Sequence, residues 1–131
     1  SFAGRIQVRD HIAGFDLMLL TSISEGQPLA VMEGMAAGIA QIATHVGACR
    51  ELLQGAGSDD LGAAGLVVPV MDVEHIAQAI VDLAHHPDRR RQMGQAGQKR
   101  IQRLYRKQDF LRQYEALYRN WLATTPLSQG D

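Results

Sequence analysis

Short apolar segments alternate with longer segments of helical periodicity along nearly the whole chain, and this alternation limits the fold more than any other feature. Segments of strand length lie at 15–20, 41–44 and 65–69. Helices are predicted over 7–13, 28–37, 49–53, 73–84, 88–105 and 110–122. Strands and helices that alternate at this spacing form parallel sheets with right-handed crossovers. We therefore predict an α/β fold, a partial Rossmann-like parallel sheet of about three strands with helices on both faces.

The loops that follow these strands are where a ligand is expected. The segment from Phe15 to Leu20 is almost continuously apolar, which favours a strand buried on both faces, as is usual in parallel sheets. Ligands of open parallel sheets bind outside the carboxyl ends of the strands. Functional residues should therefore follow Leu20, Thr44 and Val68.

Composition favours a soluble globular protein with one modest core, because 46% of the residues are hydrophobic and 21% are charged. No apolar run reaches the roughly 20 residues of a membrane-spanning helix, and the first residues lack the regions of a signal peptide. The single cysteine, Cys49, cannot form an internal disulfide. We therefore expect a cytoplasmic protein.

The charges divide the chain into two unequal parts. Residues 1–86 carry three basic and ten acidic side chains, whereas residues 87–131 carry ten basic and four acidic ones. The cationic part is interpreted either as a solvated helical face or as a surface for an acidic partner or a membrane leaflet. Nucleic acid is not expected as a partner, because no Gly-aromatic motif or stacking ladder accompanies the basic residues.

One helix combines an apolar sequence with a single charge. The predicted helix over 28–37 has apolar residues on every side, so we expect it to be buried, and Glu33 is its only charged residue. A buried carboxylate costs several kcal/mol unless a hydrogen bond satisfies it. Glu33 is therefore either a core glutamate held by a backbone amide or a residue that binds a ligand.

Glu25 strengthens the second interpretation, because it stands just before the same helix start, beside Gly26, which allows close backbone approach. The free N–H groups and positive dipole end of a helix N-terminus attract phosphate. Carboxylates accept hydrogen bonds from sugar hydroxyls. Two carboxylates around one helix start thus match a nucleotide-sugar, which has phosphates between two hydroxylated rings.

These residues carry a resemblance to a known family. Residues 24–29 and 33–38 resemble the E-x7-E segment of retaining GT-B glycosyltransferases of family 4, and the likeness extends over most of the chain. It includes the segments 16–22, 46–52, 65–69 and 93–97. The sequence from Thr21 to Leu29 is most similar to the glycosyltransferase subgroup of Pel-type exopolysaccharide systems. Ala40 and Gly34 depart from the family pattern, where proline and alanine are usual, and imply slightly altered packing.

The resemblance implies a role for each residue of the segment. Glu25 would bind hydroxyls of the transferred sugar and is our candidate catalytic residue, although no residue here acts as a nucleophile. The amides of Gly26 and Gln27 would face sugar or phosphate, and those of Leu29 and Ala30 would hold phosphate. Glu33 would bind the ribose. Gly47, in the glycine turn, completes the predicted donor-binding set; no metal and no cofactor is implied, and a nucleotide-sugar such as UDP-glucose would be the substrate.

The resemblance also implies that the chain is part of a larger enzyme. Residues 1–122 would be the C-terminal part of a donor domain and 123–131 a frayed tail. The N-terminal acceptor domain, the early strands and the basic residues that usually hold the diphosphate would lie elsewhere in the full protein, which could contact a membrane peripherally. In isolation, the piece would be inactive and would form homo-oligomers through an exposed strand edge or uncovered helix faces.

Other interpretations remain open. The chain could be a catalytically idle nucleotide-binding or interaction module, or part of a GT-B-type nucleotide-sugar epimerase. The histidines show no metal-ligand spacing and are expected at the surface: His11, His45, His75, His85 and His86. Ser22 and Ser24 lack the elbow motif of a hydrolase and are expected to form hydrogen bonds within the loop. Cys49 is either a packed thiol or, beside Arg50, a thiol of lowered pKa.

Overall fold

A three-stranded parallel sheet forms the centre of the computed structural model, which describes residues 4–57 and 59–124. The strands are β1 (Leu17–Leu20), β2 (Ala40–Thr44) and β3 (Gly65–Val68), in the order β1-β2-β3. Leu17 pairs with Ala40, and Gln41 pairs with Gly65. Every residue of β2 is buried, as expected for the central strand of a covered parallel sheet. The predicted α/β class and the predicted strands are confirmed.

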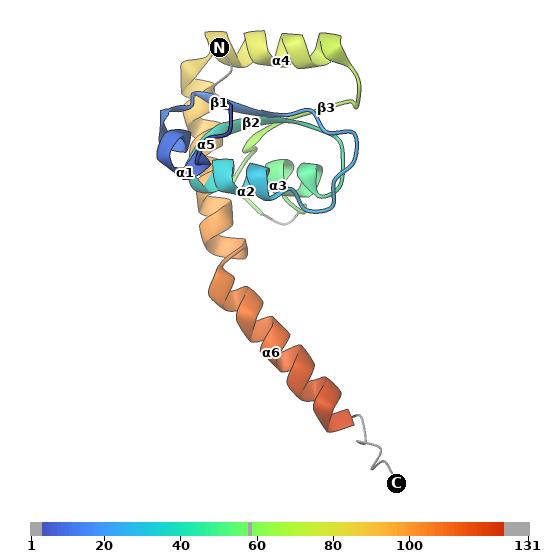
Figure 1. The fold of residues 1–131 in the computed structure, drawn as a ribbon. Helices are drawn as coiled ribbons and strands as arrows, with labels where there is room; N and C mark the ends of the chain where they lie inside the picture. Colours follow the sequence, from blue (N-terminus) through green and yellow to red (C-terminus); the bar gives the residue numbers. More distant parts are fainter. Residues whose placement is uncertain (1–3, 58, 125–131) are drawn as a thin grey trace.

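Helices cover both faces of the sheet, as predicted. They are α1 (Val8–His11), the 3-10 helix η1 (Ile12–Gly14), α2 (Leu29–Ala36), α3 (Cys49–Gln54), α4 (Val73–His85), α5 (Pro87–Leu104) and α6 (Lys107–Thr124). Figure 1 shows α4 on one side of the sheet, α2 and α3 on the other, and α5 crossing from one side to the other. This arrangement places the strand-to-helix loops at one edge of the sheet.

Two hydrophobic clusters lie on the two faces of the sheet. The first joins α2 and α3 to the strands, with Met35 and Leu52 fully buried, and the second joins α4 and α5 to the opposite face through Leu83 and Met93. Gly38 ends α2 at a φ of +77°, and the Ile39 N–H bonds back to the Gly34 carbonyl oxygen at 3.0 Å. This glycine-terminated helix end turns the chain directly into β2.

The N-terminal helix is shorter than predicted. The segment 7–13 forms one turn of α-helix in α1 followed by η1 rather than a continuous helix. The strand predicted from Phe15 begins at Leu17, and β1 is an edge strand whose Leu19 is 46% exposed. The expectation of burial on both faces is therefore wrong for β1 in this chain, whereas the predicted exposed strand edge is present.

The last helix, α6, carries an apolar stripe whose residues are all exposed: Leu111, Tyr114, Leu117, Tyr118 and Trp121. This agrees with the expectation of uncovered helix faces. Figure 1 shows α6 extending away from the sheet and its helices. Leu104, the last residue of α5, is also exposed. The tail predicted for 123–131 is helical as far as Thr124, and residues 125–131 lie outside the described part of the chain.

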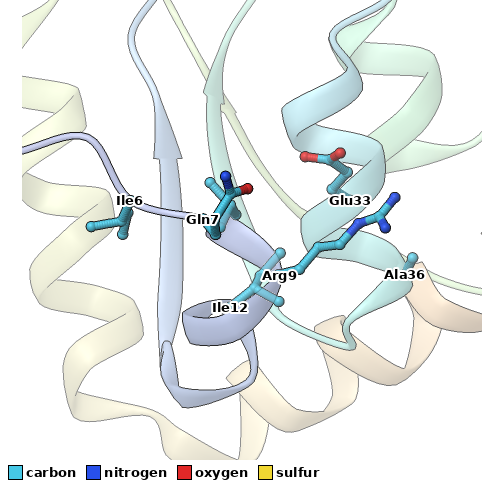
Figure 2. Close-up of a pocket in the computed structure, with 7 residues that line it drawn as sticks. Ile6, Gln7, Arg9, Ile12, Glu33 and Ala36 are labelled. Carbon is cyan, nitrogen blue, oxygen red and sulfur yellow. The ribbon is translucent and has the colours of Figure 1, made fainter.

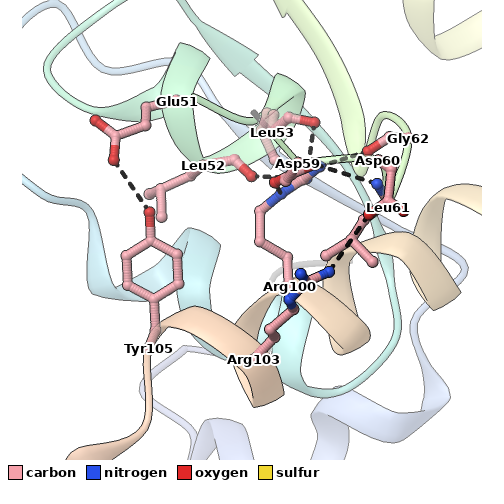
Figure 3. A network of polar contacts seen from close by, with 10 residues as sticks. All are labelled: Glu51, Leu52, Leu53, Asp59, Asp60, Leu61, Gly62, Arg100, Arg103 and Tyr105. Atoms are coloured by element: carbon pink, nitrogen blue, oxygen red, sulfur yellow. Dashed lines mark hydrogen bonds and ion pairs between the residues drawn. The ribbon is translucent and has the colours of Figure 1, made fainter. Parts of the chain in front are cut away.

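A buried arginine joins α5 to the loop between α3 and β3 (Figure 3). The Arg100 side chain is 1% exposed and forms two bonds to the Asp59 carboxylate, at 2.5 and 2.7 Å. It also donates to the carbonyl oxygens of Leu52, Leu53 and Gly62. These bonds satisfy the guanidinium fully, which is the condition under which a charge can be buried.

Most arginines of the cationic part have partners within the chain. Arg89 pairs with Asp82, Arg91 with Asp88, and Arg112 with Asp109. Arg90 donates to the Leu83 and Ala84 carbonyl oxygens at the end of α4, where helix carbonyls otherwise lack a partner. These pairs favour the solvated helical face over a surface for an acidic partner.

Candidate functional site

The loops after β1 and β2 meet at the carboxyl edge of the sheet, where a ligand site was predicted. Gly47 has a φ of +47°, and a Cβ atom placed on it would lie 2.5 Å from the Glu25 carbonyl oxygen. The Ala48 N–H donates to the Gly26 carbonyl oxygen at 2.9 Å. The structure thus brings Glu25, Gly26 and Gly47 together, and glycine at position 47 permits the close approach of the two loops.

Two hydroxyl groups support the half-buried Glu25. The Ser22 hydroxyl donates to Glu25 Oε1 at 2.7 Å. The Thr44 hydroxyl, at the end of β2, lies 2.6 Å from the Ser22 carbonyl oxygen. Ser22 is therefore a hydrogen-bonding residue of the loop, as predicted, but its carboxylate partner was not foreseen. The three-residue spacing between Ser22 and Glu25 was the available signal, since such short polar spacings often form local side-chain bonds.

The start of α2 is open to a ligand. Pro28 is its N-cap residue and supplies no side-chain cap to the helix. The first N–H groups of a helix have no partner within the helix, so those of Leu29 and Ala30 are available in the first turn. Both residues are exposed, and Leu29 is 70% exposed. Exposed amides and the helix dipole together suit an anionic group.

The expectation that α2 is buried on every side is wrong. Val31, Gly34 and Met35 face the core, whereas Glu33 is exposed. The helix is short and covers only one side of the sheet, so its outer face is left uncovered by residues 4–57 and 59–124. Glu33 is therefore not a core glutamate, and the burial cost that first drew attention to it does not arise.

Glu33 lines a cavity of about 510 Å³ between α1 and α2. The other residues of its wall are Ile6, Gln7, Val8, Arg9, Ile12 and Ala36. Figure 2 shows Arg9 reaching from α1 toward α2, below the Glu33 carboxylate. The cavity thus combines aliphatic walls with one acid and one cation. Sequence reasoning missed Arg9, because nothing local in the sequence relates it to a residue 24 positions later.

Gln27 and Leu29 face a different cavity, of about 400 Å³, at the junction of α5 and α6. Leu104, Arg106 and Phe110 are among the residues on its far wall. The predicted donor residues therefore surround the first half of α2: Glu25 and Gly47 at its approach, Gln27 and Leu29 on one side, Glu33 on the other. They form an open corner, not an enclosed pocket.

The remaining chemical candidates have structural roles. Cys49 is fully buried. Burial raises the pKa of its thiol, and the negative charge of Glu25 adds to this effect, whereas a hydrogen bond with the Val46 backbone opposes it. Cys49 is a packed thiol. The five histidines are exposed, as predicted. Among residues 4–57 and 59–124, no group of three or more His, Cys, Asp or Glu side chains is placed to hold a metal ion, and no helix is long and apolar enough to span a membrane.

The three-stranded parallel sheet, with helices on both faces and loops at its carboxyl edge (Figure 1), defines a Rossmann-like domain of the kind found in GT-B proteins, and comparison with known proteins gives the family. The model of the family Glycosyl transferases group 1 matches residues 1–86. The chain belongs to this family. It superposes on sucrose-phosphate synthase (tll1590) from Thermosynechococcus elongatus with a TM-score of 0.84 and 26% identity, over 95% of this chain and 31% of that one.

Two curated bacterial proteins are similar in sequence. N-acetyl-alpha-D-glucosaminyl L-malate synthase of Bacillus anthracis is 31% identical over 111 residues, which cover 85% of this chain and 28% of the relative. EpsD of Bacillus subtilis (strain 168), a proposed glycosyltransferase, is 34% identical over 84 residues, which cover 64% of this chain and 20% of that protein. The chain thus spans less than a third of the length of each relative.

Proposed function

We propose that the protein containing this chain transfers a glycosyl group from a nucleotide-sugar, such as UDP-glucose, to a saccharide or lipid-linked acceptor with retention of configuration. The observation that carries the proposal is the placement of two accessible carboxylates, Glu25 and Glu33, around the uncapped start of α2. Membership of a glycosyltransferase family supports the reaction class. We further propose a cytoplasmic enzyme whose pathway is exopolysaccharide synthesis of the Pel type.

Each end of the donor has a complementary group in this corner. The free oxygen of Glu25 accepts hydroxyls of the transferred sugar, and Gly26 and Gln27 present amides beside it. The amides of Leu29 and Ala30 hold the diphosphate, and Glu33 accepts the ribose hydroxyls. The 510 Å³ cavity behind Glu33 leaves space for the nucleoside.

The protein's contribution to such a reaction is position and charge. With retention, the departing phosphate assists the acceptor hydroxyl on the same face of the sugar, so no side chain attacks the anomeric carbon. Groups held in place before the reaction stabilise the charge that develops on the sugar and phosphate. The residues that bind the acceptor, and further cationic side chains for the diphosphate, come from the rest of the full protein, including an N-terminal acceptor domain.

Calorimetric titration of the full-length protein tests this assignment. UDP-glucose, GDP-glucose and ADP-glucose are titrated into wild type and into Glu25→Ala and Glu33→Ala variants. We expect each variant to weaken binding of the preferred donor by about tenfold or more, since hydrogen bonds to a charged group contribute about 1.5–3 kcal/mol. Glu74→Ala, which removes an exposed glutamate of α4, is the matched control and should bind as wild type.

Transfer of labelled sugar by the same proteins separates an enzyme from an idle binding module. Full transfer activity in both glutamate variants would show that the site lies elsewhere. Tight binding without turnover to any saccharide or lipid-linked acceptor would favour the binding module, and release of a donor with an inverted sugar hydroxyl would favour the epimerase.

A further inference from the structure

Ser22 forms a hydrogen bond with one of the two carboxylate oxygens of Glu25. Its hydroxyl donates to Oε1 at 2.7 Å across three residues of the loop between β1 and α2. A hydroxyl-to-carboxylate bond is charge-assisted and stronger than a neutral one. With Oε1 engaged, the second oxygen, Oε2, remains free to accept a hydrogen bond from a ligand, and rotation of the carboxylate is restricted.

Ser22 is itself held by the buried core of the sheet. Thr44 is fully buried at the end of β2, and its hydroxyl lies 2.6 Å from the Ser22 carbonyl oxygen. The Leu20 carbonyl oxygen lies at 3.5 Å, so the single hydroxyl proton is better placed for Ser22. The backbone of the loop is thereby fixed to the central strand, and the Ser22 hydroxyl is aimed by a rigid element rather than by a free loop.

A second contact limits the loop from the opposite side. The Gly26 carbonyl oxygen accepts the Ala48 N–H at 2.9 Å, so the backbone is anchored on both sides of Glu25. With the backbone anchored at Ser22 and at Gly26, the position of the Glu25 carboxylate depends on its side-chain torsions. The Ser22 hydroxyl restricts them.

We propose that Ser22 is a positioning residue for the donor sugar: anchored by Thr44, it holds the Glu25 carboxylate in the rotamer that receives the hydroxyls of the transferred sugar. This inference rests on the proposed function and adds a residue to it. It makes recognition of the sugar depend on Ser22, while recognition of the nucleoside diphosphate does not, because the phosphate amides and Glu33 lie on α2 beyond the hydrogen bond.

The test compares a nucleotide-sugar with its nucleotide. Ser22→Ala in the full-length protein is titrated with UDP-glucose and with UDP alone, or with the corresponding pair if GDP-glucose or ADP-glucose binds better. We expect about tenfold weaker binding of the sugar nucleotide and unchanged binding of the nucleotide. Ser22→Thr, which keeps a hydroxyl, should restore most of the sugar affinity. Ser24→Ala, an exposed serine of the same loop, is the matched control.

A double-mutant cycle with Glu25→Ala identifies the route of the effect. If Ser22 acts through Glu25, Ser22→Ala has no further effect on sugar binding once Glu25 is alanine. Equal weakening of UDP and UDP-glucose by Ser22→Ala, or wild-type binding of both, would overturn the positioning role while leaving the proposed function intact. Failure of wild type to bind any of the three donors would overturn the proposed function and this inference with it.

Discussion

At the scale of single residues, the site depends on glycine at the contact between its two loops. We expect Gly47→Ala to destabilise the protein by about 1–3 kcal/mol, because alanine is disfavoured at positive φ and its Cβ would overlap the Glu25 backbone. Displacing that backbone should also weaken donor binding. Urea unfolding and calorimetry measure the two effects. Gly14→Ala, with open space around the new Cβ, should change stability by less than about 0.5 kcal/mol, and equal effects of both variants would contradict the argument.

A second residue-scale prediction concerns a packing pair beneath α2. A Cβ atom on Gly34 would lie 2.6 Å from Met18 Sδ and 3.0 Å from Gln41 Cδ. Gln41 is buried and donates to the Ile39 carbonyl oxygen at 3.0 Å, so it cannot move away without losing that bond. We expect Gly34→Ala to cost about 1–3 kcal/mol and Gln41→Ala to recover part of the loss in the double variant. Additive losses by thermal unfolding would show that the two residues do not compete for space.

At the scale of elements, sequence periodicity predicted almost every helix and strand, because strand-length apolar runs and glycine or proline boundaries are local signals. The exposure of Glu33 was harder to foresee, since periodicity shows which face of a helix is apolar but not whether anything covers it. Glu25 and Gly47 were predicted as site residues from a motif. The two hydroxyls that support Glu25 were missed: that of Ser22 despite its local three-residue spacing, and that of Thr44 because it lies on β2, far from the loop in sequence.

Arg100 illustrates the same limit inside a predicted element. Arg100 stands among other basic residues of α5, and nothing in the neighbouring sequence distinguishes it from them. It is nevertheless fully buried, and its ion-pair partner Asp59 lies 41 residues earlier. We expect Arg100→Met to destabilise the protein by about 3–5 kcal/mol, because it leaves a buried carboxylate without its cation and removes a hydrogen-bond donor from three carbonyl groups. Arg103→Met, an exposed residue of the same helix, should cost less than about 1 kcal/mol in urea unfolding.

The Asp59–Arg100 pair also makes stability depend on pH. The hydrogen bonds from Arg100 hold the pKa of Asp59 below its usual value. The Leu61 N–H lowers this pKa further, whereas burial opposes the shift. A carboxyl with a lowered folded pKa stabilises the fold fully above its unfolded pKa of about 4, and this contribution is lost as the pH falls through the folded value. Urea midpoints measured from pH 6 to pH 2 should therefore fall less steeply for Asp59→Asn than for wild type. Parallel curves would contradict this link.

At the scale of the whole molecule, the edge of β1 and the apolar face of α6 are not covered by any of the residues that the structure describes. At the edge of β1, Leu19 is exposed and no described strand pairs on the outer side. The apolar face of α6 includes Leu117, Tyr118 and Trp121. The relatives are more than three times as long as this chain. Exposed edges and large apolar faces associate with another copy.

We therefore predict that the 131-residue chain in isolation forms oligomers whose mass rises with concentration, as measured by light scattering during size-exclusion chromatography. Two variants separate the surfaces. Leu19→Lys places a charge on the strand edge, which opposes strand pairing, and Leu117→Glu with Trp121→Glu places charges on α6. Val81→Lys, on the exposed side of α4, is the matched control and should oligomerise as wild type. The variant that yields a monomer identifies the surface, and a wild-type chain that stays monomeric at high concentration would show that neither surface drives association.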